Sequence, residues 1–400
     1  MTADLETLRA ELVTRVREQE GARHDPVTTA LRAVPRHLFL PGLPPESVYV
    51  DEAIVTKRDG DGRPISSSSQ PAIMATMLDQ LDLAPGHRVL EIGAGTGYNA
   101  ALLDHVVGAD GQVISVDIDP DVVEQARTNL TAAGHAAVRV ECVDGVGGFE
   151  EQAPYDRMIA TVGVWDLAPA WLAQLRPDGR IVVPLDLNGM HYSVAFERAG
   201  DHWRSRSVVA CGFMPMRGEL AGPKRMHRLA ENLTLTVPDG VDVDVDALRV
   251  AVDGSTAEAA IGVPAGSAWL FDGLSQWQAR TGEARWVVLG EEAERPVWLA
   301  RAPVKWQAMH MTAGLLDGTS LAVLARGASP DDDLGVIGYG PLAGELATRL
   351  AELVRTWDTA GRPSTAGLRI EAYPTAVPEL PAGQVISKRH HRFLLSHQDS

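Results

Sequence analysis

Short apolar runs alternate with amphipathic stretches through the first half of the chain. The runs that we expect to form strands are residues 88–92, 113–117, 137–143, 156–162 and 180–185. The stretches with apolar positions at helical spacing are residues 71–83, the segment ending at residue 105, residues 120–133 and residues 167–175. Strands alternating with helices of this length are typical of βαβ units and a parallel sheet. The pattern predicts a doubly wound α/β fold, preceded by short helices in residues 2–37.

The regular alternation ends near residue 217, where glycine, proline and basic residues mix in a stretch typical of a domain boundary. Further on, short apolar runs at residues 233–237, 285–290 and 321–326 are separated by turns, and a strong helical pattern covers residues 342–357. A chain of 400 residues is long enough for two or three domains. We therefore expect an α/β domain over residues 1–222 and an α+β accessory domain over residues 223–400.

The composition disfavours several classes of partner. The formal net charge is -17, so the surface as a whole repels phosphate backbones and anionic lipid head groups. No uncharged apolar run approaches the roughly 18 residues of a membrane span. Cys142 and Cys211 are too few for a disulfide framework and lack the spacing of a zinc site. We expect a cytoplasmic protein that binds neither nucleic acid nor membranes.

Two further patterns need an explanation before metal binding is set aside. Asp242, Asp244 and Asp246 have the spacing of a calcium loop, but Ala247 stands where such a loop requires glycine. We interpret these aspartates as alternating residues of a strand. The histidines near the C-terminus have no partner ligands at zinc spacing. We therefore expect no bound metal.

The strongest motif is VLEIGAGTGY, residues 89–98, in which a predicted strand runs directly into Gly93, Gly95 and Gly97. Glycine lets the backbone approach a ligand closely, and the helix that follows offers unpaired N–H groups. The dinucleotide fingerprint has the spacing G-x-G-x-x-G. Here the spacing is G-x-G-x-G, and Tyr98 stands at the place of the last glycine.

Acidic residues accompany this glycine loop. Glu91 precedes it in the same predicted strand, Asp117 ends the next strand, and Asp144-Gly145 follows the third. A carboxylate at the position of Asp117 can accept both hydroxyl groups of a ribose. Carboxylates attract a sulfonium and repel a pyrophosphate, which favours S-adenosylmethionine as the cofactor. The alternative is that the glycines only make a tight turn and that the acidic side chains are solvated.

In this order, the motifs resemble those of the protein-L-isoaspartate O-methyltransferase family. The matching pieces are Val34-Pro35-Arg36 with Phe39, Ser69-Gln70-Pro71, VLEIGAGTGYNAALL, Val116-Asp117, Val143-Asp144-Gly145, APYD, LRPDGRIVV and Phe213-Met214-Pro215. The resemblance implies a Rossmann-like class I methyltransferase sheet. It also implies an enzyme that transfers a methyl group from S-adenosylmethionine to a carboxylate of a peptide or protein.

The resemblance further implies which residues form the site. In the family, the serine or threonine at the position of Ser69 faces the acceptor carboxylate, and the cofactor lies over the glycine loop. We expect Ser69, together with Ser68, to orient the carboxylate through hydroxyl hydrogen bonds. Alternatively, these serines form only a polar loop or a helix N-cap. The implied cofactor-binding residues are Glu91, Gly93, Gly95, Gly97, Asp117, Ile118, Asp144 and Gly145, and the implied substrate-binding residues are Gln70, Val164, Trp165 and Phe213.

Three hypotheses for the function stay open at this point. The serine run, Trp165 and the long C-terminal region resemble a branch associated with ATP-grasp peptide maturases and lanthipeptide pathways. Members of that branch methylate an aspartate of a ribosomally made peptide, and the ester then closes to an aspartimide; this is the leading hypothesis. Repair of isoaspartyl or D-aspartyl residues in damaged proteins is the alternative. The third is a degenerate domain that only binds a cofactor or a peptide.

Under the leading hypothesis, the C-terminal region binds the peptide. The basic run KRHHR at residues 388–392 is one candidate for a surface that receives an acidic peptide. A charge run near a chain terminus is more commonly solvated, and we favour that interpretation.

Overall fold

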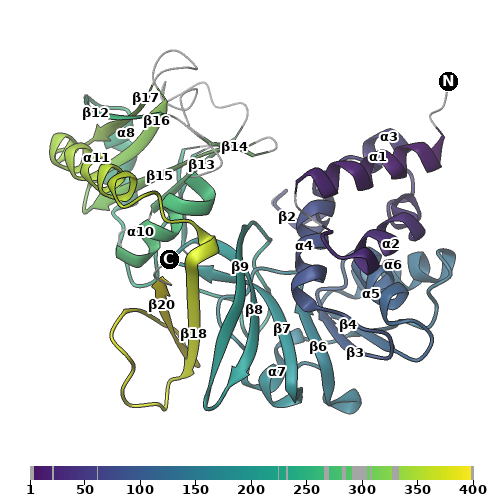
Figure 1. Ribbon diagram of the computed structural model, residues 1–400. Coiled ribbons are helices and arrows are strands. Elements are labelled where there is room, and N and C mark those ends of the chain that lie inside the picture. The colour runs from purple at the N-terminus through teal and green to yellow at the C-terminus, as the bar shows by residue number, and fades with distance from the viewer. Residues whose placement is uncertain are drawn as a thin grey trace.

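The structure is a computed structural model that describes residues 4–19, 22–60, 62–223, 225–230, 233–264, 270–281, 285–290, 304–306, 309–326 and 333–397. Two large β-sheets form the body of the molecule, and the N-terminal helices cover one end of the larger sheet (Figure 1). Among the helices that the structure describes, none has both the length and the apolar character needed to span a bilayer.

The larger sheet has ten strands and contains the predicted parallel strands. Its parallel part is, in spatial order, β5 (Arg139–Cys142), β4 (Gln112–Asp117), β3 (Arg88–Ile92), β6 (Tyr155–Ala160) and β7 (Leu175–Leu187). The chain order runs outward from β3 on one side and from β6 on the other, so it reverses between these two strands. In open α/β sheets, ligands bind outside the carboxyl ends of the strands at such a point. The doubly wound fold is therefore confirmed, and it indicates where a site is expected.

Helices cover both faces of this parallel part because successive strand residues point to opposite faces. Val89 is buried under one set of helices, whereas Leu90 belongs to the core on the other face. The first face carries α4 (Pro71–Leu81), α5 (Tyr98–Val107) and α6 (Pro120–Ala132), and the second carries α7 (Pro169–Gln174). Outside α4 and α5 lie α1 (Leu5–Glu18), α2 (Asp25–Ala33), η1 (Arg36–Phe39) and α3 (Pro45–Val48).

The larger sheet continues into strands that the apolar pattern did not predict. These antiparallel strands are, in spatial order, β8 (Met190–Ala199), β9 (His202–Cys211), β18 (Leu368–Pro374), β20 (His391–His397) and β19 (Gln384–Ser387). In Figure 1 the yellow C-terminal strands lie beside the teal β9 and β8. The topology thus differs from the expected division at residue 222, because residues 368–397 belong to the sheet that carries the glycine loop.

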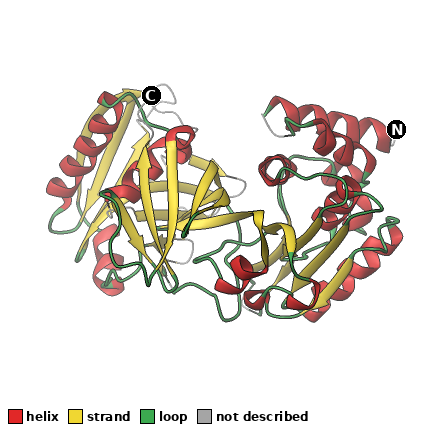
Figure 2. Ribbon diagram, turned by 60° about the horizontal axis from the view of Figure 1, so that its bottom comes forward, coloured by secondary structure: helices red, strands yellow, loops and turns green. Residues whose placement is uncertain are grey.

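The smaller sheet lies between these two parts in the sequence and has eight antiparallel strands. Its strands are β10 (Met226–Ala230), β11 (Leu233–Thr236), β13 (Arg285–Gly290), β15 (Met309–Asp317), β16 (Ser320–Arg326), β17 (Asp333–Tyr339), β12 (Thr256–Pro264) and β14 (Val304–Trp306). The long helix α11 (Ala343–Thr359) packs along one face (Figure 2), and α8 (Val245–Val252) packs on the other. A π-helical turn, η4 (Leu270–Leu274), leads into α10 (Ser275–Thr281).

The two sheets share one apolar core. This core joins Leu315 of β15 and Leu350 and Trp357 of α11 to Tyr192 and Phe196 of β8. The smaller sheet, with α11, therefore packs directly against the larger sheet.

One sequence interpretation in this region is wrong. Asp244 does not lie in a strand: it is the N-cap of α8 and accepts the Ala247 N–H at 2.9 Å. A carboxylate at this place satisfies one of the free N–H groups of the first helical turn.

Candidate active site

The glycine loop lies at the carboxyl end of β3, where both backbone conformation and space require glycine. The φ angle is +101° at Gly93, +51° at Gly95 and +86° at Gly97, a region that other residues rarely adopt. A Cβ atom on Gly93 would lie 2.7 Å from Thr161 Oγ1. The Thr161 hydroxyl donates a hydrogen bond to the Gly93 carbonyl at 2.5 Å. Thr161, which the sequence analysis missed, thus ties the loop to the end of β6.

Glu91 lies beneath the loop rather than on its open side. Its side chain is fully buried and accepts hydrogen bonds from Ser115 Oγ at 2.5 Å and from Asn99 Nδ2 at 2.7 Å. Burial raises the pKa of Glu91 to about 7, against the effect of these two hydrogen bonds. The carboxyl group therefore supports the loop from between β4 and the first turn of α5. A contact of Glu91 with the cofactor, expected from the sequence, stays a prediction.

Asp117 and Ile118 lie beside the loop at the end of β4. The Asp117 carboxylate accepts the N–H groups of Gly95 at 3.3 Å and of Asp119 at 3.1 Å. Burial raises the pKa of Asp117, and these hydrogen bonds limit the rise. The Ile118 side chain is 37% exposed, among the more open apolar residues of the described chain. A carboxylate and an open apolar surface are thus adjacent in the sequence at this edge, as a ribose and a flat base require.

Asp144 and Gly145 lie at the end of the neighbouring strand β5, in front of the short turn η2 (Gly145–Gly147). One Asp144 oxygen accepts the Val146 N–H at 3.0 Å, and the other accepts the Glu219 N–H at 2.9 Å. Gly218 packs so closely that a Cβ atom on it would overlap this carboxylate. The chain after residue 216 therefore lies directly against the acidic edge of the sheet.

Basic side chains also reach this edge. Lys57 Nζ lies 2.7 Å from Asp119 and 2.9 Å from Asp121, and the Arg217 guanidinium lies 3.5 Å from Asp119. Burial alone would raise the pKa of Asp119, but the hydrogen bond and charge of Lys57 outweigh it, and the pKa is lowered. Asp119 thus stays ionised and links two separate segments to α6.

A two-stranded ribbon, β1 (Ile54–Arg58) and β2 (Pro64–Ser68), brings the serine run to the glycine loop. The Ser67 carbonyl oxygen lies 3.4 Å from the position of a Cβ atom on Gly95. Ser68 is 3% exposed, and its hydroxyl has no hydrogen-bond partner among the described residues. An unsatisfied buried hydroxyl costs about 1–3 kcal/mol, so Ser68 is suited to a ligand that would satisfy it. Ser69 follows as a half-buried residue beyond the end of β2.

Arg36 and Asp51, which the sequence analysis did not assign, hold this serine segment in place. The fully buried Arg36 guanidinium donates to the carbonyls of Val48, Val50, Glu52 and Ser69 at 2.7–3.1 Å. Asp51 accepts the Ala72 N–H and the Gln70 side-chain amide, both at 2.8 Å. The cap of α4 is thus provided by Asp51 and not by the serines, and Gln70 has a structural partner.

The other predicted substrate residues have different surroundings. Val164 is fully buried in the core beside β7, and its role in substrate binding stays a prediction. The Trp165 indole N–H donates to Asp239 at 2.6 Å. Phe213 is half-buried and donates its backbone N–H to His191 Nδ1 at 3.2 Å. Trp165 therefore joins the loop after β6 to the segment that follows β11 in the smaller sheet.

The basic run at residues 388–392 is only partly solvated, because Arg389 is exposed whereas two other members of the run are buried. Lys388 is 9% exposed and His391 only 3%. Among the described residues, no group of three or more His, Cys, Asp or Glu side chains could hold a metal ion.

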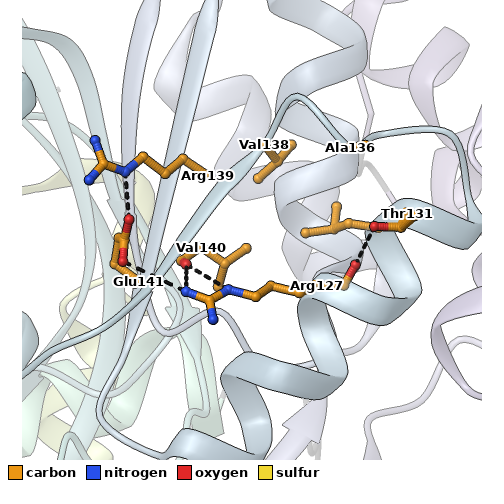
Figure 3. A pocket seen from close by; sticks show the side chains of 8 residues that line it. Arg127, Thr131, Ala136, Val138, Arg139, Val140 and Glu141 are labelled. Atoms are coloured by element: carbon orange, nitrogen blue, oxygen red, sulfur yellow. Dashed lines mark hydrogen bonds and ion pairs between the residues drawn. The ribbon is translucent and has the colours of Figure 1, made fainter.

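A surface hollow of about 370 Å³ lies elsewhere, between α6 and β5 (Figure 3). Its polar groups already have partners: Arg127 donates to the Val140 carbonyl at 2.6 Å, and Arg139 pairs with Glu141 at 2.5 Å. We therefore place the site at the glycine loop.

The doubly wound sheet, with its glycine loop and acidic strand ends at the point where the strand order reverses, defines a class I S-adenosylmethionine-dependent methyltransferase. Comparison with known proteins narrows this class. The family described as protein-L-isoaspartate(D-aspartate) O-methyltransferase matches residues 7–221. The chain belongs to this family and is an enzyme that methylates a carboxyl group.

Individual relatives agree with this assignment. A protein-L-isoaspartate O-methyltransferase of Methanopyrus kandleri is 38% identical over 213 residues, which is 53% of this chain and 92% of the relative. Protein-L-isoaspartate O-methyltransferase 2 of Archaeoglobus fulgidus is 35% identical over 216 residues, 54% of this chain and 95% of the relative. A solved structure named protein-L-isoaspartate O-methyltransferase shares the fold over 91% of this chain and 96% of its own, with a TM-score of 0.51 and 24% identity.

Proposed function

We propose that this enzyme esterifies the carboxylate of an isoaspartyl residue in a peptide or protein, with S-adenosylmethionine as the methyl donor. The family and its named relatives support this substrate class. The observation that carries the proposal is the position of the serine segment over the glycine loop, with the Ser67 carbonyl 3.4 Å from the Cβ position of Gly95. Hydroxyl groups that orient a carboxylate and a loop that holds the donor then share one edge of the sheet.

The described residues fit this cofactor. Asp117 would accept the ribose hydroxyls, Ile118 would contact the base, and the glycine loop would accommodate the donor's amino-acid part at close range. Asp144 would receive a polar edge of the base. When bound, S-adenosylmethionine supplies a methyl group on a sulfonium. The acidic edge favours such a cation over a phosphate-bearing cofactor.

The acceptor needs little assistance from the protein. A carboxylate is already ionised near neutral pH, so no general base is required, and the protein contributes alignment and exclusion of water. Ser69 would donate a hydrogen bond to one carboxylate oxygen, and Ser68 would donate from its buried position. Arg36 holds the Ser69 carbonyl at 3.1 Å and so fixes the direction of this segment.

A second candidate substrate is an unaltered aspartate of a maturing peptide, methylated on the way to an aspartimide. Trp165 supports this candidate, because Gly222, Asp239 and Lys388 all pack against it or bind it. A loop held in this way suits a single, specific peptide better than many different proteins. The smaller sheet does not separate the two hypotheses. A solved protein named protein-L-isoaspartate O-methyltransferase has a fold that extends over 91% of this chain. A cytoplasmic location agrees with both hypotheses and stays a prediction.

The decisive experiment offers two short peptides of the same sequence, one with isoaspartate and one with aspartate, the latter also in a cyclised form. Tritiated S-adenosylmethionine reports methyl transfer. Transfer to the isoaspartyl peptide alone supports the proposal, and transfer to the cyclised aspartyl peptide alone overturns it in favour of the second candidate. In both cases Ser69→Ala should lower kcat/KM by about tenfold, the value of one hydrogen bond to a charged group. Absence of transfer to all of these peptides would contradict both proposed substrates.

A further inference from the structure

The turn between β19 and β20, residues 388–390, together with His391, the first residue of β20, is called the C-terminal turn. It lies against the loop after β6, residues 161–166, which Thr161 ties to the glycine loop. Under the proposed function this loop lies behind the carboxylate that is methylated, and it is called the acceptor loop. Lys388 Nζ donates to the Trp165 carbonyl at 2.5 Å and also to the Asp186 carbonyl. The ammonium group also lies 5.8 Å from the Trp165 ring centre. A buried cation is held in place by such acceptors because it has lost its water.

Asp166 makes the second connection between these two segments. Its fully buried carboxylate accepts the His390 N–H at 2.6 Å and lies 3.2 Å from His391 Nδ1. It also accepts the Leu167 N–H at 2.8 Å. The C-terminal turn therefore fixes the far end of the acceptor loop. The near end is fixed by the Thr161 hydroxyl on the Gly93 carbonyl.

Arg389 makes a third connection, to a different part of the site. Its guanidinium donates to the Glu219 carbonyl at 3.1 Å and lies 5.7 Å from the Trp165 ring centre. The Glu219 N–H in turn donates to Asp144 at 2.9 Å. The C-terminal turn is thus linked both to the acceptor loop and, through Glu219, to the Asp144 carboxylate.

We propose that the C-terminal turn positions the active site, with Lys388 as a positioning residue for the acceptor loop and Arg389 as a positioning residue for the segment that holds Asp144. The proposal rests on the proposed function for the identity of the acceptor. It assigns the last strands of the chain a role in methyl transfer and not only in stability. Neither residue touches the reacting atoms.

The two connections predict separate kinetic signatures. Lys388→Met keeps the length of the side chain but removes the donors, so the acceptor loop loses its anchor. We expect kcat for the isoaspartyl peptide to fall about tenfold, since small displacements of aligned groups cost at least this much. The Kd for S-adenosylhomocysteine should change less than about twofold. Lys388→Arg, which keeps the charge and the donors, should recover most of kcat.

Arg389→Ala should have the opposite pattern. Loss of one hydrogen bond to the Glu219 segment should raise the Kd for S-adenosylhomocysteine about threefold, measured by calorimetry, with a smaller effect on kcat. The matched control is Arg206→Met on β9, whose side chain is 65% exposed and lies in the same sheet. This control should leave both quantities unchanged.

Equal losses of kcat and of cofactor affinity in both variants would overturn the proposal, because a purely structural role predicts a common loss. Wild-type values in both variants would overturn it as well. If Lys388→Met does not fold, Lys388→Gln, which removes the charge, tests the first connection by the same fall in kcat, and Arg389→Ala tests the second. If the wild-type enzyme methylates no peptide, the proposed function fails. The Arg389→Ala calorimetry then still decides whether the C-terminal turn acts on the cofactor edge.

Discussion

Replacement of Glu91 by glutamine tests the finding that this carboxyl group supports the loop from below. The fold raises the pKa of Glu91 from 4.5 to about 7, chiefly by burial. Between these values the folded chain keeps a proton that the unfolded chain releases, so the free energy of unfolding falls as the pH rises. At about 1.4 kcal/mol per pKa unit, the full loss is about 3 kcal/mol above pH ~7. Glutamine does not titrate and should not show this loss.

The amide has the size of the protonated carboxyl group and can keep a hydrogen bond to each of its two partners. Its oxygen can accept from Asn99 Nδ2, and its nitrogen can donate to Ser115 Oγ, which now donates to Glu91 at 2.5 Å. We therefore expect Glu91→Gln to match the wild type in stability near pH ~5 and to exceed it by about 2–3 kcal/mol near pH ~8. Urea unfolding of both proteins at the two pH values measures this difference, and other titrating groups cancel in the comparison.

The same variant separates the two roles considered for Glu91. A supporting role predicts a change of less than about threefold in the Kd for S-adenosylmethionine, since the hydrogen bonds of the loop persist. Equal pH dependence in both proteins would refute the raised pKa. A loss of cofactor affinity as large as that of an Asp117 variant would show that Glu91 contacts the cofactor after all.

Three further predictions concern the same edge of the sheet. Asp117→Asn should raise the Kd for S-adenosylhomocysteine by about 10–100-fold, the value of hydrogen bonds to a charged acceptor. Calorimetry measures this Kd, and wild-type affinity would contradict the ribose role. Gly93→Ala places a methyl group 2.7 Å from Thr161 Oγ1 at a φ of +101°. We expect this variant to show no cofactor binding in calorimetry. Wild-type binding would contradict the requirement for glycine at this position. Arg36→Met removes four hydrogen bonds to carbonyls. It should lower the free energy of unfolding by about 3–5 kcal/mol. Urea unfolding measures this value, and a change below about 1 kcal/mol would contradict the prediction.

The parallel strands and the glycine loop were predictable because their signals are local. An apolar run followed directly by glycines identifies a buried strand and its turn without any distant contact. The position of Glu91 was also within reach of the sequence. Side chains in a strand alternate, so Glu91 shares a face with Val89 and points toward α5. The charge of Glu91 alone does not distinguish a carboxylate beneath the loop from one beside it.

Other features depend on partners far along the chain. β8 and β9 mix basic and polar residues with apolar ones, so no continuous apolar run marks them. Lys388 belongs to a run that reads as solvated, yet its acceptors are 223 and 202 residues away in the sequence. Arg36 donates to backbone carbonyl groups, and since every residue has one, the sequence does not show which residues are its partners. Burial of such cations follows from tertiary packing and is invisible in local patterns.

The pairing of β18 with β9 has a consequence for how the molecule is made. Residues 368–397 must leave the ribosome before the sheet that carries the glycine loop acquires β18, β20 and β19, whereas the other strands of this sheet lie before residue 212. Until then, β9 would present an open edge to other nascent chains, a known route to aggregation. A variant that stops near residue 222 should therefore be hard to keep in solution.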